Sequence, residues 1–189
     1  MTRQLSAALK ALLVLTVLCG VLYPAAILAV GLLVPDRAAG QPVEVGGREV
    51  GSALLGQPPS GAEWFQGRPS ASDASGETSG GSNLGPSNPD LATAVAEREQ
   101  ALRAANPDAP QEIPADALTS SASGLDPDVS PAYARWQAPR VAAARGLDVS
   151  QVLRLVADHV RPAPLGGVLG QERVNVLELN VALAALGRG

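Results

Sequence analysis

The chain begins with a long stretch of apolar positions. Residues 11–34 contain no side chain that is charged at neutral pH, and leucine, valine and alanine dominate them. Because a bilayer's hydrocarbon core is about 30 Å thick and a helix rises about 1.5 Å per residue, roughly 20 apolar residues are enough to cross it. In lipid, an isolated segment satisfies its backbone only as a helix. We therefore predict a transmembrane helix over residues 11–34, between residues 1–10 and a domain over residues 35–189.

The charges on either side of this stretch predict its orientation. Arg3 and Lys10 precede it with no acidic residue nearby, whereas Asp36 and Arg37 follow it and cancel each other. Positively charged flanks stay in the cytoplasm. We expect a single-pass protein of the bacterial plasma membrane, with a cytoplasmic N-terminus and an extracytoplasmic main domain.

Other interpretations of the stretch fit it less well. A cleavable secretory signal has a shorter apolar stretch that ends in small residues of an Ala-x-Ala kind, and this one has no such ending. A lipoprotein signal would place a small residue before Cys19, where Leu18 stands. Pro24, next to Tyr23, has no N–H, which predicts a kink or a stretch that packs against another helix.

Beyond the stretch, the pattern predicts an α+β domain in which helix predominates. Alternating residues around Gly46-Gly47 predict a hairpin over residues 43–50. Residues 63–70 are typical of a short extended piece that ends in a turn. Ser, Gly, Asn and Pro dominate residues 70–89, which predicts a loop.

Four helices follow from capping residues and apolar spacing. Asn88 caps the first, which Asn106-Pro107 ends, and Ser130 starts a second, which Pro139 should interrupt and restart and Gly146 should end. The third runs from about residue 148 to 159. The fourth follows Asn175, which with Glu178 fits a reciprocal capping box. The apolar positions along these helices are Leu91, Val95, Leu102, Ala105, Tyr133, Trp136, Val149, Val152, Leu153, Val156, Val160, Val176, Leu179, Leu183 and Leu186.

Charge and composition narrow the classes of partner. Of the 14 basic residues only Arg3 and Lys10 precede the outer domain, whereas all 18 acidic residues lie within it. An acidic domain is a poor fit to nucleic acid. Cys19, the one cysteine, lies in the predicted span, so no intrachain disulfide is expected. With few aromatic residues the core must rely on Leu, Val and Ala, which makes stabilisation by a partner plausible.

Candidate chemistry in the outer domain is sparse. His159, the only histidine, lies at a predicted helix end, where a structural role is more common than a place in a hydrolase triad. One histidine and one membrane cysteine cannot form a zinc site. The Asp126-Pro127-Asp128 run lacks the further acidic positions and Gly of a calcium loop, so we expect Asp126 to organise a turn.

A weak anion site is conceivable over residues 79–83. The Ser-Gly-Gly-Ser-Asn run there offers backbone N–H groups that can cradle an anion. The outer domain has no lysine and no Gly-Lys-Ser or Gly-Lys-Thr, so a nucleotide site at this loop alone is weakly indicated.

Several longer motifs occur in a fixed order along the chain. They are Tyr23-Pro24, WFQGRPSA at 64–71, SGGSNLGPSNP at 79–89, SASGLDP at 121–127, WQAPRVA at 136–142, ARG at 144–146 and RVNVLELN at 173–180. With these motifs the chain resembles the C subunit of the bacterial Kdp potassium-transporting ATPase, and the resemblance covers nearly the whole chain.

The resemblance implies a non-catalytic accessory subunit of an ATP-driven potassium importer. Its implied partners are a channel-like potassium-translocating subunit, a P-type ATPase subunit and membrane lipid. It also implies a role in assembly and as a catalytic chaperone that raises the ATPase subunit's affinity for ATP. ATP and potassium then belong to the complex, with no cofactor assigned to this chain. Because the predicted topology separates the outer domain from cytoplasmic ATP, we expect an indirect effect.

Two alternatives stay open at this point: a modulator that contacts ATP directly together with the ATPase subunit, and a membrane-tethered exported enzyme. The residues within the family-like motifs that we expect to contact partners or to fix loops are Tyr23, Pro24, Trp64, Gly67, Arg68, Ser82, Asn83, Asn88, Ser123, Asp126, Trp136, Gln137, Arg140, Asn175 and Glu178.

Overall fold

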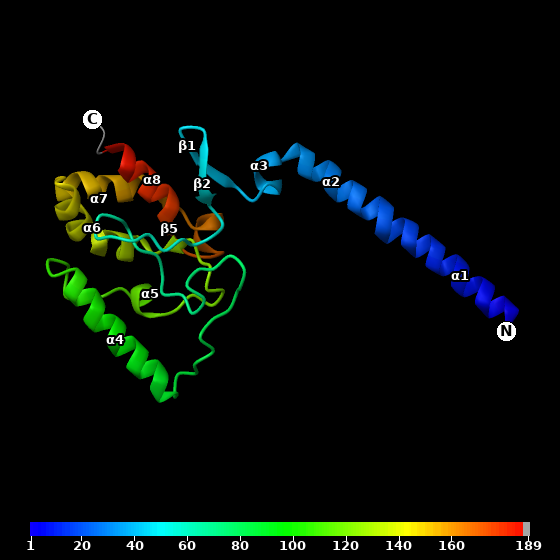
Figure 1. Cartoon of the computed structure of the whole chain (residues 1–189), viewed down its shortest axis with the longest axis horizontal. Coiled ribbons are helices and arrows are strands. Elements are labelled where there is room, and N and C mark those ends of the chain that lie inside the picture. Colours follow the sequence, from blue (N-terminus) through cyan, green and yellow to red (C-terminus); the bar gives the residue numbers. More distant parts are fainter. Residues whose placement is uncertain (187–189) are drawn as a thin grey trace. The chain divides into compact units, whose positions relative to one another are not determined.

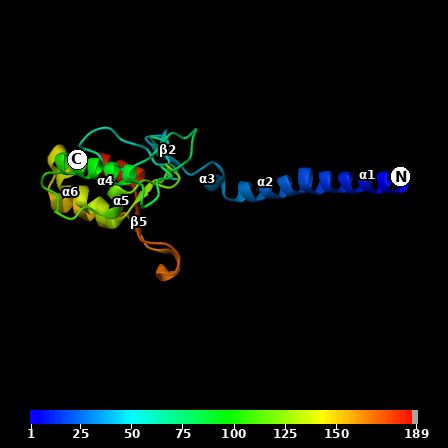
Figure 2. The same ribbon diagram turned by 90° about the horizontal axis from the view of Figure 1, so that it is seen from below.

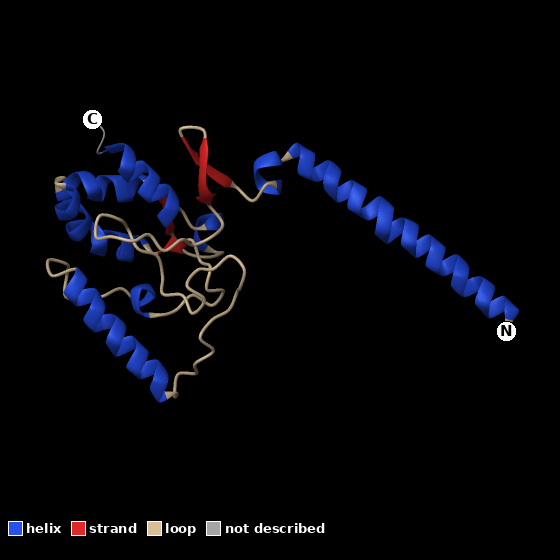
Figure 3. Cartoon of the chain, in the orientation of Figure 1, coloured by secondary structure: helices blue, strands red, loops and turns tan. Residues whose placement is uncertain are grey.

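The computed structural model describes residues 1–186 of the chain and divides into two compact units, one over residues 1–42 and one that starts at Val43. The first unit is a long helix followed by a short one (Figure 1). The second is a mixed helix and sheet domain in which helix predominates (Figure 3), as predicted.

The N-terminal helix runs without a break from Thr2 to Leu33, through α1 (Thr2–Val17), a π-helical stretch η1 (Leu18–Leu22) and α2 (Tyr23–Leu33). At 32 residues it is long and apolar enough to cross a membrane, and no residue in it is buried. The helix starts before the uncharged stretch does. α3 (Pro35–Ala38) follows it.

Pro24 affects this helix in a specific way. It lacks the N–H that would bond to the carbonyl one turn earlier, and the turn that precedes it is π-helical. The structure thus has a π-helical turn before Pro24. The kink and the packing against another helix both stay predictions.

The predicted hairpin forms at the start of the second unit. β1 (Pro42–Val45) and β2 (Arg48–Ser52) pair around Gly46 and Gly47, whose φ angles are +62° and +77°. Two positive φ values at the central positions are what a tight hairpin turn requires, which explains the two glycines.

A small antiparallel sheet joins distant parts of the domain. Its strand order is β3 (Asp128–Val129), β5 (Arg173–Asn175) and β4 (Val160–Arg161). Val174 in the central strand pairs with both Val129 and Val160. These short strands were not among the predicted elements.

Four helices of the domain match their predicted signals: α4 (Pro89–Ala105), α6 (Pro131–Arg145), α7 (Val149–Asp158) and α8 (Val176–Leu186). The short α5 (Ala115–Leu118) was not predicted. Asn88, Ser130 and Asp148 accept N-cap hydrogen bonds from backbone N–H groups. Gly146 ends α6 in the left-handed conformation at φ +64°.

The core lies among α6, α7, α8 and the three-stranded sheet. Tyr133 and Trp136 face inward as predicted, and Phe65 from the loop before α4 is fully buried in the same core cluster. Residues 63–70 form no strand, and residues 70–89 form the predicted loop. The remaining buried apolar residues of the core are Ala117, Val129, Ala134, Ala138, Val141, Ala142, Val152, Val156, Val174, Val176, Leu179 and Leu183.

Pro139 does not restart the helix, so that prediction is wrong. α6 continues through it from Pro131 to Arg145. A proline inside a helix costs about 3 kcal/mol. Buried residues on both sides, including Ala138 and Val141, hold the helix in place. Tertiary packing therefore outweighs the local cost.

Two further predictions need correction. The Glu178 side chain does not complete a reciprocal capping box. Its Oε1 instead accepts a hydrogen bond from Arg161 Nη2 at 2.6 Å. Asn175 is itself the last residue of β5, so its backbone belongs to the sheet. Val149, Leu153 and Leu186, expected on buried faces, are about 40% exposed, at 40%, 38% and 43%.

Candidate interaction site

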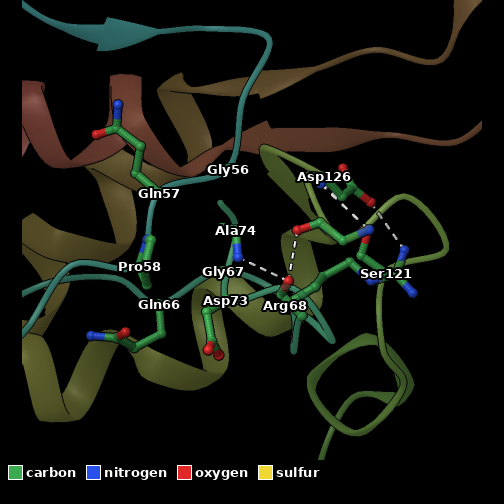
Figure 4. A pocket seen from close by; sticks show the side chains of 12 residues that line it. Gly56, Gln57, Pro58, Gln66, Gly67, Arg68, Asp73, Ala74, Ser121 and Asp126 are labelled. Atoms are coloured by element: carbon green, nitrogen blue, oxygen red, sulfur yellow. Dashed lines mark hydrogen bonds and ion pairs between the residues drawn. The ribbon is translucent and has the colours of Figure 1, made fainter. Parts of the chain in front are cut away.

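A cleft of about 380 Å³ opens among the irregular segments of the domain (Figure 4). Its walls come from three loops, around residues 56–58, 66–74 and 121–126. Arg68 and Asp126, both predicted site residues, line it together with Gly67. The sequence separates Arg68 from Asp126 by 58 positions, so only the fold brings them together.

Arg68 braces two of these loops. One Nη donates to Asp126 Oδ2 at 3.0 Å, and the other donates to the carbonyls of Thr119 and Ser120, each at 3.3 Å. Its Nε is buried and has no hydrogen-bond partner within residues 1–186. Asp126 also accepts from the Asp128 N–H at 3.1 Å, which is the turn role expected for it.

Serine side chains and backbone groups tie the long loop to residues 121–124. Ser70 Oγ donates to the Gly124 carbonyl at 2.7 Å, and the Gly80 N–H donates to the Ser123 carbonyl at 2.8 Å. A Cβ at Gly124, whose φ is +70°, would lie 2.4 Å from Ser72 Oγ. The close approach of the two loops therefore requires glycine at this position.

Two buried carboxamide side chains hold the backbone of Phe65 and Gln66, next to the cleft. Asn180 accepts from the Phe65 N–H and donates to the Phe65 carbonyl, both at 2.9 Å. Gln137 does the same for Gln66, at 2.8 and 3.0 Å. The segment is thus paired by side chains of α6 and α8 in the way a neighbouring strand would pair it.

Arg140 adds four contacts to the same cluster. Its Nε donates to Asn106 Oδ1 at 2.8 Å, and its Nη groups donate to Gln137 Oε1 at 2.8 Å and to the carbonyls of Ala62 and Trp64. Burial lowers the pKa of the Arg140 guanidinium. A planar fork with five donors suits this set of acceptors, which a lysine amine would not satisfy.

The two tryptophans among the predicted site residues, Trp64 and Trp136, are held in different ways. The Trp64 ring lies 4.1 Å below the Arg145 guanidinium carbon, a cation–π contact. The Trp136 Nε1 donates to the Pro110 carbonyl at 2.9 Å, which ties α6 to the loop after α4.

Asn175 links the sheet, α8 and the segment after β2. Its side chain accepts from the Glu178 N–H at 3.1 Å and donates to the Ala53 carbonyl at 2.9 Å and to Asp128 Oδ1 at 3.2 Å. Burial raises the pKa of Asp128, and the bond from Asn175 and the charge of Arg173, 3.1 Å away, oppose that rise.

The predicted residues do not form one site. Ser82 and Asn83 are exposed on the long loop, with Asn83 in the left-handed region at φ +54°. Asn88 caps α4 through the Asp90 N–H at 2.8 Å, and Tyr23 and Pro24 belong to the N-terminal helix. Most of the others brace loops of their own domain. Contact with a partner stays a prediction for all of them.

Asn180 is the important residue that the sequence analysis did not select. It lies on the helix face that also carries Val176 and Leu183, and only 8% of it is exposed. A lone amide among apolar positions of a helix face is a signal for a buried hydrogen bond.

The remaining candidate chemistry lies apart from the cleft. His159 follows α7, and its Nδ1 lies 2.8 Å from the Leu155 carbonyl, which is a helix-end role. Among residues 1–186, no three His, Cys, Asp or Glu side chains come together in a group that could hold a metal ion.

An apolar helix of spanning length joined to a domain with its own core is consistent with a single-pass membrane protein. Comparison with known proteins gives the family. The family model described as "K+-transporting ATPase, c chain" matches residues 5–185. The chain therefore belongs to the KdpC subunits of the potassium-transporting ATPase.

Individual relatives agree along almost their whole length. The potassium-transporting ATPase KdpC subunit of Kineococcus radiotolerans is 55% identical over 183 residues, which cover 96% of this chain and 93% of the relative. The KdpC subunit of Variovorax paradoxus is 51% identical, with 98% and 97% covered. That of Herpetosiphon aurantiacus is 49% identical, with 93% of each covered.

Proposed function

We propose that this chain is an accessory subunit that stabilises the assembly of a potassium-importing ATPase. Its N-terminal helix packs against the potassium-translocating subunit, and its outer domain covers the extracytoplasmic face of that subunit. The P-type ATPase subunit and membrane lipid complete its surroundings.

The observation that carries this proposal is the helix from Thr2 to Leu33. Its 18-residue apolar window is 0% buried among the described residues, so its own unit leaves about five turns of apolar surface uncovered. Such a surface needs lipid or other helices around it. The π-helical turn before Pro24 gives the helix an irregular face, which suits packing against protein.

The outer domain supports an assembly role more than a chemical one. Its predicted site residues Arg68, Gln137, Arg140 and Asn175 use their polar atoms on loops of the same domain. These bonds hold a loop-rich surface in one conformation. A preorganised surface loses less conformational entropy when it binds, which favours a docking role.

We further propose that the effect on ATP affinity is indirect. The charge rule places the outer domain across the membrane from cytoplasmic ATP. The helix can still favour one state of the ATPase subunit, which by linkage alters its affinity for ATP. Direct contact through residues 79–83 has less support, because the Gly80 N–H already donates to the Ser123 carbonyl.

A helix exchange tests the proposal. Residues 2–33 are replaced by an unrelated transmembrane helix of equal length that keeps Arg3 and Lys10, and the chimera is expressed with the other subunits. We expect the chimera to insert but to copurify poorly with the potassium-translocating subunit. Full assembly of the chimera would contradict the helix as the main anchor. Membrane extraction of the chimera alone is the control for insertion.

A further inference from the structure

The loop between β4 and β5 carries large apolar side chains into solvent. Leu165 is 74% exposed, Val168 79% and Leu169 57%. No side chain from Pro162 to Gln171 is ionisable. Figure 2 shows this loop, in orange beside β5, standing away from the rest of its domain. Residues 162–171 are called the apolar loop below.

The apolar loop rises from a fixed base. Arg161 at one end pairs with Glu178 of α8, and Arg173 at the other pairs with Asp128 of β3 at 3.1 Å. β4 and β5 pair directly below it. The base therefore holds the loop in one direction relative to the sheet and α8.

The backbone of the loop adopts conformations that apolar residues rarely choose. Leu165 has a φ of +50°, and Gly166, Gly167 and Gly170 have φ values of +65°, +95° and +79°. A leucine in the left-handed region is uncommon. Here that conformation exposes the apolar Leu165 side chain to solvent, so its strain does not improve packing within the domain. Such a conformation is typical of a surface that binds a partner.

The absence of charge in the apolar loop favours a protein over lipid as its binding partner. Membrane-inserting segments combine apolar residues with lysine or arginine for the head groups, or with tryptophan and tyrosine at the interface. The apolar loop has none of these, and the arginines at its two ends are already paired with carboxylates. A surface without charge or free cations is complementary to an uncharged apolar recess in a protein.

We infer that the apolar loop docks into an uncharged, apolar recess on the extracytoplasmic face of the potassium-translocating subunit. This inference rests on the proposed function, because it names the contact by which the outer domain covers that subunit. Val168, the most exposed of the three, is the centre of the contact.

Photo-crosslinking in the assembled complex tests the contact. A photoreactive amino acid replaces Val168 in the full chain, and the same residue replaces Gln100, which is exposed on α4, as the matched control. We expect crosslinks from position 168 to the potassium-translocating subunit and few from position 100. Crosslinks from position 168 to lipid, or to no neighbour in a complex that has assembled, would overturn the inference and leave the proposed function intact. Failure of the unsubstituted chain to copurify with that subunit would overturn both.

A charge in the loop gives a second, independent test. Val168→Asp should lower the crosslink yield from a photoreactive residue at position 169 to the potassium-translocating subunit by about tenfold or more, because an apolar recess cannot solvate a carboxylate. Val168→Thr, which keeps the shape without charge, should lose less, and Gln100→Asp should lose nothing. The melting temperature of the full chain alone should not change with Val168→Asp, since this side chain is exposed. Equal crosslink yields with Val168→Asp and Gln100→Asp would contradict docking.

Discussion

Single side chains, rather than strands, hold the segment around Phe65 and Gln66. Gln137 and Asn180 are buried and each satisfies both backbone groups of one residue in that segment. A buried polar group left unpaired costs about 1–3 kcal/mol, so these amides matter more than their small size suggests.

Gln137→Leu should therefore be strongly destabilising. It removes the partners of the Gln66 N–H and C=O and one acceptor of Arg140, and we expect a loss of about 2–4 kcal/mol in the free energy of unfolding. Urea denaturation of the full chain in detergent measures it. Gln66→Leu is the control, because the bonds to Gln137 use only the backbone of residue 66. Equal effects of the two substitutions would refute this account.

Asp128 gives the domain a specific pH dependence. Burial raises its pKa above the ordinary value of 3.8, so on acidification the folded chain takes up this proton before the unfolded chain does. The contribution of Asp128 to stability therefore falls as pH rises from about 3.8 through the raised pKa.

Asp128→Asn removes that titration while keeping an acceptor for Asn175. The stability of the original chain minus that of the variant should be larger below pH 3.8 and decrease above it. Denaturation curves at a series of pH values give this difference. A difference that is constant with pH, or that grows as pH rises, would show that the Arg173 pair outweighs burial.

At the scale of elements, two helices begin with the same residue type in different surroundings. Asn88 at α4 makes one exposed cap bond, whereas Asn175 at α8 also holds the Ala53 carbonyl and Asp128 while nearly buried. The same substitution at both positions therefore separates capping from tertiary bonding.

Asn88→Ala should cost about 1 kcal/mol, the usual value for an exposed N-cap. Asn175→Ala should cost about 1–3 kcal/mol more, because it leaves the Ala53 carbonyl without its bond. Thermal unfolding of the two variants, prepared alike, is the measurement. Similar costs would mean that Asn175 acts as a cap alone.

The elements also show why some features were predictable from the sequence. Caps and stops act within a few residues, so Asn88, Ser130 and Gly146 marked helix ends correctly. Pro139 and Glu178 were misjudged because distant residues decide their state, the core around α6 in one case and Arg161 in the other. The hydrogen bonds between Asn180 and Phe65 were not predicted for the same reason, because the two residues are 115 positions apart in the sequence.

Only a few residues of the candidate cleft were predictable. The motifs pointed to Gly67, Arg68 and Asp126, but no local pattern shows how the three loops meet. The strands β3, β4 and β5 are two or three residues long, too short for an alternating pattern to appear. Their register follows from the packing of the helices around them.

At the scale of the whole molecule, the helix and the domain have separate tasks in the proposed complex. With the helix in the bilayer, residues 34–42 let the domain move no more than about 30 Å from the membrane surface. That tether holds the domain at high local concentration near its partner, so a modest contact such as the apolar loop is sufficient for docking.

The side of the membrane on which the domain lies is the most direct test of this account. Ser82, exposed in the structure, is replaced by cysteine in a Cys19→Ala chain expressed with the other subunits, and protoplasts are treated with an impermeant thiol reagent. Gln100→Cys is a second outer position, and Gln4→Cys, which keeps Arg3 and Lys10, is the cytoplasmic control. We predict that positions 82 and 100 are labelled in intact protoplasts and position 4 only after lysis. Protection of positions 82 and 100 until lysis would place the domain in the cytoplasm, contradict the docking role and favour direct contact with ATP.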